Sequence, residues 1–253
     1  MHYSDDDRKK FLVFVSYYCN ADNILNIIDH LSQSVDIDDF VIVSNNHDIT
    51  FPSAAKVIYG SNRLLDMSGY YEGYTYFLNS GQSSKSDIVI FANDSIYHKH
   101  SIWALTVSAS LLFNRFKLPT SFYSGIPSEI LGFDSAHYKY FSTYFFISDF
   151  FTIAECFNSI GNFYLRERKR IVPIIRGLPL SRWSPRTAVR SLDNVARLKR
   201  KCVTLEFIFS YYAIKKEIYL PLPLFSLARV IRFFIKVKNF FLKNIKIAAK
   251  IIF

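Results

Sequence analysis

The stretch DIVIFANDSIY, residues 87–97, indicates which fold the chain adopts. Its five apolar residues, 88–92, form the short continuous run that is typical of a strand buried on both faces of a parallel sheet. Asn93, Asp94 and Ser95 follow where that strand would leave the sheet. In open α/β sheets, ligands bind outside the carboxyl ends of the strands. Asp94 is therefore placed to meet a ligand or a metal. The alternative is a polar turn in which Asp94 and Ser95 bond only to nearby backbone.

The segments before this stretch alternate between strand-like and helix-like patterns. Apolar runs predict strands at 11–15, 40–43 and 56–59, and the helical period predicts helices over 23–31 and 66–81. We expect Asp66 or Ser68 to cap the second helix and Gly81 to end it. The alternation predicts a mostly parallel sheet with right-handed crossovers. Each predicted strand ends in small polar residues, so four polar loops would line one edge, as in a nucleotide cleft.

Two glycines of the second predicted helix, Gly69 and Gly73, lie four residues apart and therefore on one helix face. Each destabilises a helix interior by roughly 1 kcal/mol relative to alanine. We expect something to lie close against that face, either the sheet or a bound ligand.

The chain beyond residue 100 is expected to continue with a helix. Proline and glycine residues then make 119–137 a predicted mobile loop, and the β-prone run FSTYFFIS, 141–148, predicts a strand. Residues 161–201 are basic and partly helical in pattern.

The composition is that of a globular protein with a large core. Half of the 253 residues are hydrophobic and 17% are aromatic, which excludes a disordered chain. The three cysteines, Cys19, Cys156 and Cys202, are far apart and lack metal-ligand spacing, which indicates a reducing compartment rather than a disulfide framework. The first residues do not resemble a signal peptide, and no apolar stretch is long enough to predict a transmembrane helix.

Charge is divided sharply along the chain. Residues 1–160 contain 10 Lys and Arg against 17 Asp and Glu, a net charge of −7, and residues 161–253 contain 21 against 4, a net charge of +17. The C-terminal third is therefore expected to face an anionic partner. Residues 224–253 carry seven basic residues and no acid, which is typical of an amphipathic helix at a membrane surface. The alternatives are a helix that docks on the core and, for the basic third as a whole, a nucleic-acid-binding surface.

The order of these motifs resembles a known family. The segments VIVSNN at 41–46, GSNRLLDMSGYYEGY at 60–74, FANDSIY at 91–97 and STYFFIS at 142–148 carry the resemblance. They are similar to segments of GT-A glycosyltransferases, and more closely to the bacterial rhamnan-synthesis F family and related polysaccharide glycosyltransferases. The resemblance implies an α/β, GT-A-like (Rossmann-related) fold with a mostly parallel sheet flanked by helices, here followed by a basic helical C-terminal appendage. A doubly wound fold of another kind is the alternative.

The resemblance also implies a role for each matching residue. The base and ribose of a nucleotide-sugar donor would contact Ser16, Tyr17, Asn45 and Asn46, and its diphosphate and sugar would lie by Asn62 and Asp66. Asn93, Asp94 and Ser95 stand where the family keeps an Asp-x-Asp motif. That motif holds Mg²⁺ or Mn²⁺, the Lewis acid that neutralises the diphosphate leaving group. This chain departs from the motif because Asp94 is its only carboxylate, so the metal role falls on Asp94 alone.

An inverting transferase needs a carboxylate that takes the proton of the acceptor hydroxyl. The carboxylates near the predicted loop are Glu129, Asp134 and Asp149. Asp134 is the first choice as catalytic base, and Asp149 is the other catalytic candidate. Ordinary surface charge is the alternative for each of them.

These observations predict three regions. Residues 1–160 would bind the nucleotide sugar, 161–223 would form a basic acceptor-side helical region, and 224–253 would form an amphipathic membrane-surface helix. We expect a cytoplasmic glycosyltransferase, peripheral on the inner face of the plasma membrane. It would move a hexosyl or deoxyhexosyl group to a lipid-linked or polysaccharide acceptor, on an anionic membrane surface, in bacterial surface-polysaccharide synthesis. The alternatives are a catalytically degenerate accessory protein of this fold and a basic nucleic-acid-binding protein.

Overall fold

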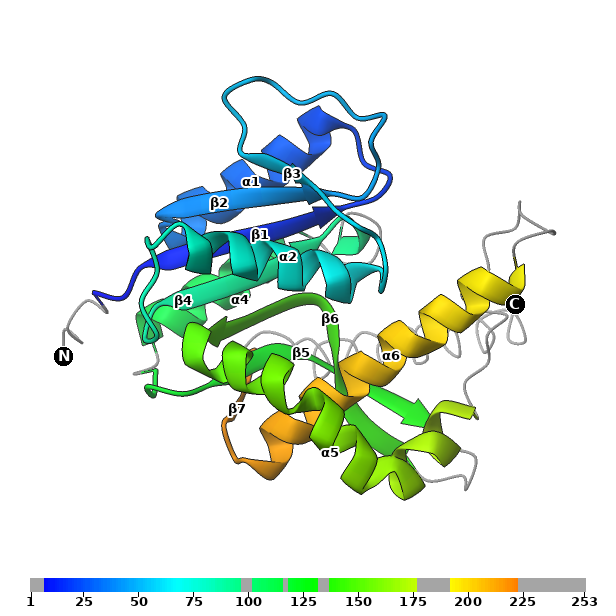
Figure 1. Cartoon of the computed structure of the whole chain (residues 1–253). Coiled ribbons are helices and arrows are strands. Elements are labelled where there is room, and N and C mark those ends of the chain that lie inside the picture. The colour runs from blue at the N-terminus through cyan, green and yellow to red at the C-terminus, as the bar shows by residue number, and fades with distance from the viewer. Residues whose placement is uncertain (1–6, 97–101, 116–117, 132–136, 177–191, 223–253) are drawn as a thin grey trace, which may run out of the picture.

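The structure is a computed structural model that describes residues 7–96, 102–115, 118–131, 137–176 and 192–222. Seven strands form one sheet with helices on both of its faces (Figure 1). The strands are β1 (Lys10–Ser16), β2 (Asp39–Ser44), β3 (Val57–Tyr59), β4 (Ile88–Asn93), β5 (Tyr123–Leu131), β6 (His137–Asp149) and β7 (Tyr219–Pro221). The helices are α1 (Ala21–Val35), α2 (Asp66–Asn79), α4 (Ile102–Arg115), α5 (Phe150–Arg176) and α6 (Leu192–Lys215).

The strand order is β3-β2-β1-β4-β6-β5-β7. Strands β3, β2, β1 and β4 are parallel, whereas β6 runs antiparallel to its neighbours β4 and β5. The prediction of an α/β fold with a mostly parallel sheet is therefore confirmed. The chain moves outward from β1 to β3 and then returns to the other side of β1 as β4. This reversal creates a topological switch point between β1 and β4, where open α/β sheets bind their ligands.

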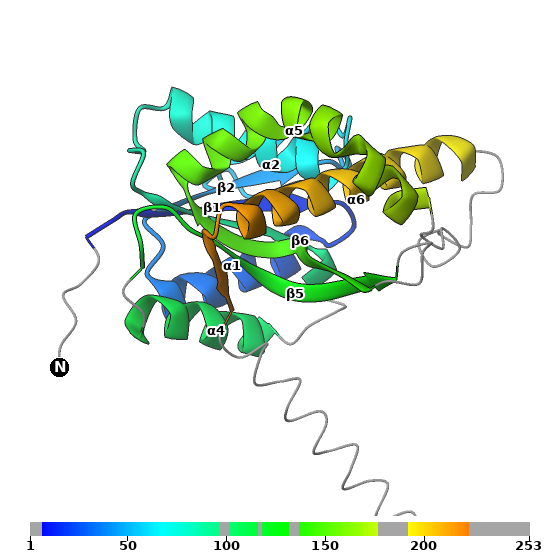
Figure 2. The same cartoon turned by 90° about the horizontal axis from the view of Figure 1, so that it is seen from below.

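The sheet separates two apolar cores. Successive residues of β1 point to opposite faces, so Leu12 and Phe14 belong to the core under α1 and α4, and Val13 and Val15 belong to the core under α2, α5 and α6. Figure 2 shows these two helix layers on either side of the sheet. All six residues of β4 are buried, as its continuous apolar run predicts for a central parallel strand.

Helix α2 lies unusually close to the sheet at its two glycines. A Cβ atom on Gly73 would lie 2.3 Å from Val13 Cγ1, and one on Gly69 would lie 2.7 Å from Val15 Cγ1. The partner of the glycine face is therefore the sheet and not a ligand.

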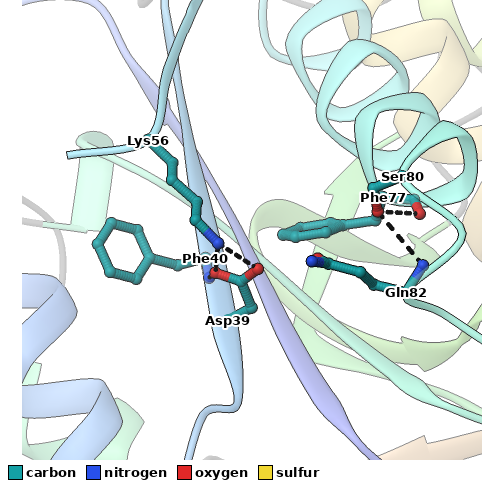
Figure 3. A network of polar contacts seen from close by, with 6 residues as sticks. All are labelled: Asp39, Phe40, Lys56, Phe77, Ser80 and Gln82. Carbon is teal, nitrogen blue, oxygen red and sulfur yellow. Dashed lines mark hydrogen bonds and ion pairs between the residues drawn. The ribbon is translucent and has the colours of Figure 1, made fainter. Parts of the chain in front are cut away.

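The ends of α2 differ from the prediction in one respect. Its N-cap residue is Leu65, which has a φ of 52° and makes no side-chain cap, whereas Ser68 Oγ donates to the Leu65 carbonyl at 2.8 Å. At the other end, Ser80 Oγ donates to the Phe77 carbonyl at 2.8 Å and accepts from the Gln82 N–H (Figure 3). Gly81, with φ +67°, follows the helix as predicted.

Figure 3 also shows how the segment before β3 is linked to β2. Lys56 Nζ lies 2.6 Å from Asp39 Oδ2 in an ion pair. The Phe40 N–H donates to the other carboxylate oxygen of Asp39 at 2.8 Å. The pair is partly exposed, so its contribution to stability is small.

The prediction of a loop over 119–137 is wrong for the part that forms β5. The register between β5 and β6 shifts at Gly125 and Ile126, a bulge that suits glycine. Pro127 lies beyond the three residues that pair with β7, so its missing N–H removes no bond to the described residues on that side. The proline and glycine that favoured a loop are therefore accommodated at an irregular stretch of strand, part of which pairs with described residues on one side only.

The division into three regions stays a prediction, and its boundaries can be placed on the described elements. The predicted boundary at 160–161 lies inside α5, and β7 belongs to the same sheet as β1. Helix α6 packs against α2, α5 and β6. The proposed membrane-surface helix, 224–253, lies outside the described residues. None of the helices in the described ranges combines the length and the apolar character needed to span a bilayer.

Candidate functional site

The loop after β1 is held by Asp94 at the switch point. Asp94 Oδ2 accepts hydrogen bonds from the backbone N–H groups of Tyr17, Tyr18 and Cys19 at 2.7, 2.8 and 3.3 Å. The Asp94 N–H in turn donates to the Val15 carbonyl at 3.2 Å. Tyr18 projects from this loop with 64% of its surface exposed. The carboxylate therefore fixes a loop that presents an aromatic ring to solvent.

The environment of Asp94 limits its use as a metal ligand. The residue is fully buried, and its second oxygen, Oδ1, forms no hydrogen bond in the described part of the chain. Burial raises the pKa of Asp94 above its ordinary value, and the three backbone donors oppose that shift only in part. Mg²⁺ and Mn²⁺ favour several oxygen ligands, and Asp94 offers one free oxygen. The residues at this position therefore fit such a cation poorly, and the metal role of Asp94 stays a prediction.

Buried polar atoms gather at the carboxyl ends of β1, β2 and β4, hereafter the carboxyl edge. Six of them form no hydrogen bond with any described residue: Ser16 Oγ, Tyr17 Oη, both amide atoms of Asn45, Asn93 Nδ2 and Asp94 Oδ1. Buried polar groups in proteins nearly always have a partner, and each exception needs an explanation. A polar ligand or ordered water at this edge would supply the partners.

Three residues meet at the carboxyl edge: Tyr17 directly after β1, Asn45 directly after β2 and Asp66 in the first turn of α2. The phenol of Tyr17 lies beside the Asp66 carboxylate and the Asn45 amide. Burial, and then the charge of Asp66, raise the pKa of Tyr17 far above its ordinary value. Tyr17 is therefore a neutral hydrogen-bond donor at neutral pH. Asn45 packs closely against Gly60: a Cβ atom on Gly60 would lie 2.1 Å from Asn45 Oδ1.

Helix α6 brings two residues to this edge that the sequence analysis did not select. Cys202 and Glu206, one helical turn apart, join Asp66 so that one ligand atom of each lies within 4.8 Å of the others. Cys202 is fully buried, and Asp66 and Glu206 are each 9% exposed. A signal was present in the sequence, because Glu206 is one of only four acids in residues 161–253 and stands in the apolar run LEFIF. We call these three residues the thiol–carboxylate cluster.

The other predicted donor residues lie in the loops around this edge. Asn46 accepts from the Asp48 N–H through Oδ1 at 3.0 Å, in a local turn. Ser95 donates its N–H to Asn93 Oδ1 at 3.0 Å. Asn62 is exposed and has a φ of 51°, in the same short loop as Leu65. Asparagine adopts such a φ readily, but Leu65, with φ 52° and ψ −133°, is strained, a feature often found near ligand sites.

The structure places Asp149 away from these residues. Asp149 pairs in the sheet with Ile88, the first residue of β4, and therefore lies about 17 Å from the carboxyl edge along that strand. Its Oδ1 accepts from the Thr152 N–H at 2.8 Å and its Oδ2 from the Phe122 N–H at 2.7 Å. Asp149 is thus a buried cap of α5 and not a candidate base at this site. Asp134 lies outside the described residues, and Glu129 is described only by its backbone in β5.

No protein family, curated protein or solved structure matches the chain.

Proposed function

We propose that the chain is a glycosyltransferase that binds a nucleotide-sugar donor at the carboxyl edge. The observation that carries the proposal is the group of buried polar atoms at the ends of β1, β2 and β4 that have no hydrogen-bond partner among the described residues. These ends flank the switch point of the sheet, which is the general position of nucleotide sites in open α/β folds. The finer assignment to a GT-A-like fold rests on the motifs at 41–46, 60–74 and 91–97.

In this proposal the loop held by Asp94 binds the nucleoside. The exposed ring of Tyr18 offers a surface for stacking of the base, and the buried phenol of Tyr17 donates to the donor. The amide of Asn45 supplies both a hydrogen-bond donor and an acceptor, which suits a ribose hydroxyl. Asp66 lies next to them, at the start of α2.

The class of acceptor is proposed from the net charge of the C-terminal third of the chain. The net charge of +17 over residues 161–253 favours an anionic partner, such as a membrane surface that carries a lipid-linked diphosphate acceptor. Peripheral attachment to the inner face of the plasma membrane, and a place in bacterial surface-polysaccharide synthesis, are parts of the same proposal.

The test is a thermal-shift screen of the full chain with UDP-, GDP-, dTDP- and CMP-activated sugars. A ligand at 100 times its Kd stabilises the folded state by about 2.7 kcal/mol, which raises the Tm of a protein of this size by about 5–10 °C. We expect one nucleotide class to give such a shift.

Two tyrosine variants then locate the binding site. Tyr18→Ala should weaken binding by about 1–3 kcal/mol if the base stacks on Tyr18. Tyr71→Ala is the matched control, because Tyr71 is also exposed (51%) but lies on α2. Loss of the shift in both variants, or in neither, would contradict the placement of the nucleoside on the β1 loop.

A donor-binding accessory protein without transfer is the second candidate. Two observations favour it. Asp94 is the only carboxylate of its motif, and Asp149 lies at the opposite edge of the sheet. Such a protein would bind the nucleotide sugar but release no nucleoside diphosphate in the presence of acceptor, and an assay of that release separates the two candidates.

A further inference from the structure

We propose that the thiol–carboxylate cluster, Asp66, Cys202 and Glu206, binds one divalent cation of the zinc type. The three ligand atoms already lie within 4.8 Å of one another. In a tetrahedral zinc site, metal–sulfur and metal–oxygen distances of about 2.3 and 2.1 Å place neighbouring ligands roughly 3.5 Å apart. Closure of the cluster around a cation therefore requires a movement of about 1 Å, which side-chain rotation provides.

The backbone presents these ligands in a favourable arrangement. Cys202 and Glu206 are four residues apart on α6, so both project from one helix face, and Cys202 Sγ lies 3.8 Å from Glu206 Oε1. Asp66 approaches from the first residue of α2. A cation would thus join two helices that are more than a hundred residues apart in sequence.

The chemistry of the ligands selects the cation. A thiolate is a soft ligand that favours Zn²⁺ over Mg²⁺ or Ca²⁺, which take oxygen ligands almost exclusively. Two carboxylates and one thiolate match the ligand types of zinc sites and leave one tetrahedral position for water or another group. On binding, the Cys202 S–H bond breaks, the sulfur lone pair binds the cation and the proton passes to solvent.

A second observation points to a cation in the same place. The Asp94 carboxylate is fully buried and its Oδ1 has no hydrogen-bond partner among the described residues. Asp94 lies near enough to Asp66 for the two carboxylates to interact. The phenol of Tyr17, whose oxygen also forms no hydrogen bond with a described residue, lies close to both Asp66 and Cys202. These acidic side chains therefore lie close to the cluster, and a cation bound by Asp66, Cys202 and Glu206 would reduce the repulsion between them.

This proposal does not depend on the identity of the nucleotide. It differs from the metal site implied by the family resemblance, because the ligands come from α2 and α6 and not from the motif at 93–95. Metal binding is measured without any donor, so failure of the metal proposal and failure of the proposed function give separate results.

The test uses the tag-free full chain, prepared without chelator. We expect inductively coupled plasma mass spectrometry to find about one equivalent of zinc per chain. In chain freed of metal, Co²⁺ should give intense visible bands of a tetrahedral site and a near-ultraviolet thiolate-to-cobalt band. Titration with Zn²⁺ should displace the cobalt and abolish these bands.

Variants assign the ligands. Cys202→Ser should remove the thiolate band, and Glu206→Gln should weaken Co²⁺ binding by about tenfold or more, since second-shell changes alone cost that much. Cys156→Ser is the matched control, because Cys156 is equally buried but lies on α5, and it should keep the band. A thiolate band that survives in Cys202→Ser would overturn the proposal. So would wild-type chain that contains no zinc and gives no thiolate band with Co²⁺, a result that does not depend on how any variant folds.

Discussion

Gly73 offers the sharpest test of the packing between α2 and the sheet. In Gly73→Ala the new methyl group would lie 2.3 Å from Val13 Cγ1 and 3.1 Å from Val43 Cγ2. Carbon atoms in contact are normally about 3.5–4.0 Å apart, so helix or strand must shift by more than 1 Å. Val13 belongs to the central strand β1, which is held on both sides. The strand therefore has little freedom to yield.

The expected net effect is a loss of stability. Overpacking a core costs about 1–3 kcal/mol, and a clash this short is expected to cost the upper value. Replacing glycine by alanine inside a helix returns about 1 kcal/mol. Gly73→Ala should therefore lower the free energy of unfolding by about 2 kcal/mol and the Tm by about 4–8 °C. Urea unfolding followed by circular dichroism measures the first quantity.

Gly161 is the matched control for this substitution. It also lies inside a helix, α5, but a Cβ there would meet no atom within 4 Å. Gly161→Ala should therefore raise stability by up to about 1 kcal/mol. The double variant Val13→Ala/Gly73→Ala should show a favourable coupling of about 1–2 kcal/mol, because removal of the valine methyl groups makes room for the new one. Equal stability of Gly73→Ala and Gly161→Ala, or simple additivity with Val13→Ala, would refute the reasoning.

Two further predictions concern the buried carboxylates. The pKa of Asp94 is raised in the folded state. Between about pH 4 and that raised pKa, the folded chain therefore binds more protons than the unfolded chain. The contribution of Asp94 to stability consequently falls as the pH rises through this window. Asp94→Asn removes the titration, and the stability of the variant relative to wild type should therefore rise between pH 4 and pH 7 in urea unfolding; a constant difference would contradict the assignment. Asp149→Ala should lose about 3 kcal/mol of stability, because it removes both the cap of α5 and the hydrogen bond from the Phe122 N–H. Its nucleotide-sugar affinity should not change, and calorimetry on the folded fraction measures that affinity. Weaker nucleotide binding by folded Asp149→Ala would contradict the conclusion that Asp149 lies away from the donor site.

The parallel half of the sheet could be predicted from the sequence because its signals are local. Short apolar runs such as FLVFV and IVIFA leave few alternatives to a buried strand. The antiparallel half of the sheet was harder to predict from the sequence. Gly125 and Pro127 are loop formers in isolation, but in β5 Gly125 lies at a bulge and Pro127 lies beyond the three residues that pair with β7.

The candidate site was predictable only in part, because only some of its residues follow from local sequence patterns. Residues at strand ends, such as Asn45 and Asp94, follow from the rule that ligands bind at the carboxyl edge. The contribution of Cys202 and Glu206 depends on how α6 packs across α2, which no local pattern specifies. Asp149 was selected because it lies near the predicted loop at 119–137, but its strand runs antiparallel and places it at the opposite edge of the sheet.

The most direct test of the proposed function is sugar transfer itself. The full chain is incubated with each labelled nucleotide sugar and with vesicles that carry a polyprenyl-diphosphate-linked acceptor, and the label in the lipid extract is followed with time. We predict that one nucleotide sugar transfers its label to the lipid fraction, with release of an equal amount of nucleoside diphosphate. Binding of that donor without transfer would support the accessory-protein alternative. A chain that neither binds any nucleotide sugar nor transfers label would contradict the assignment of the carboxyl edge as a donor site.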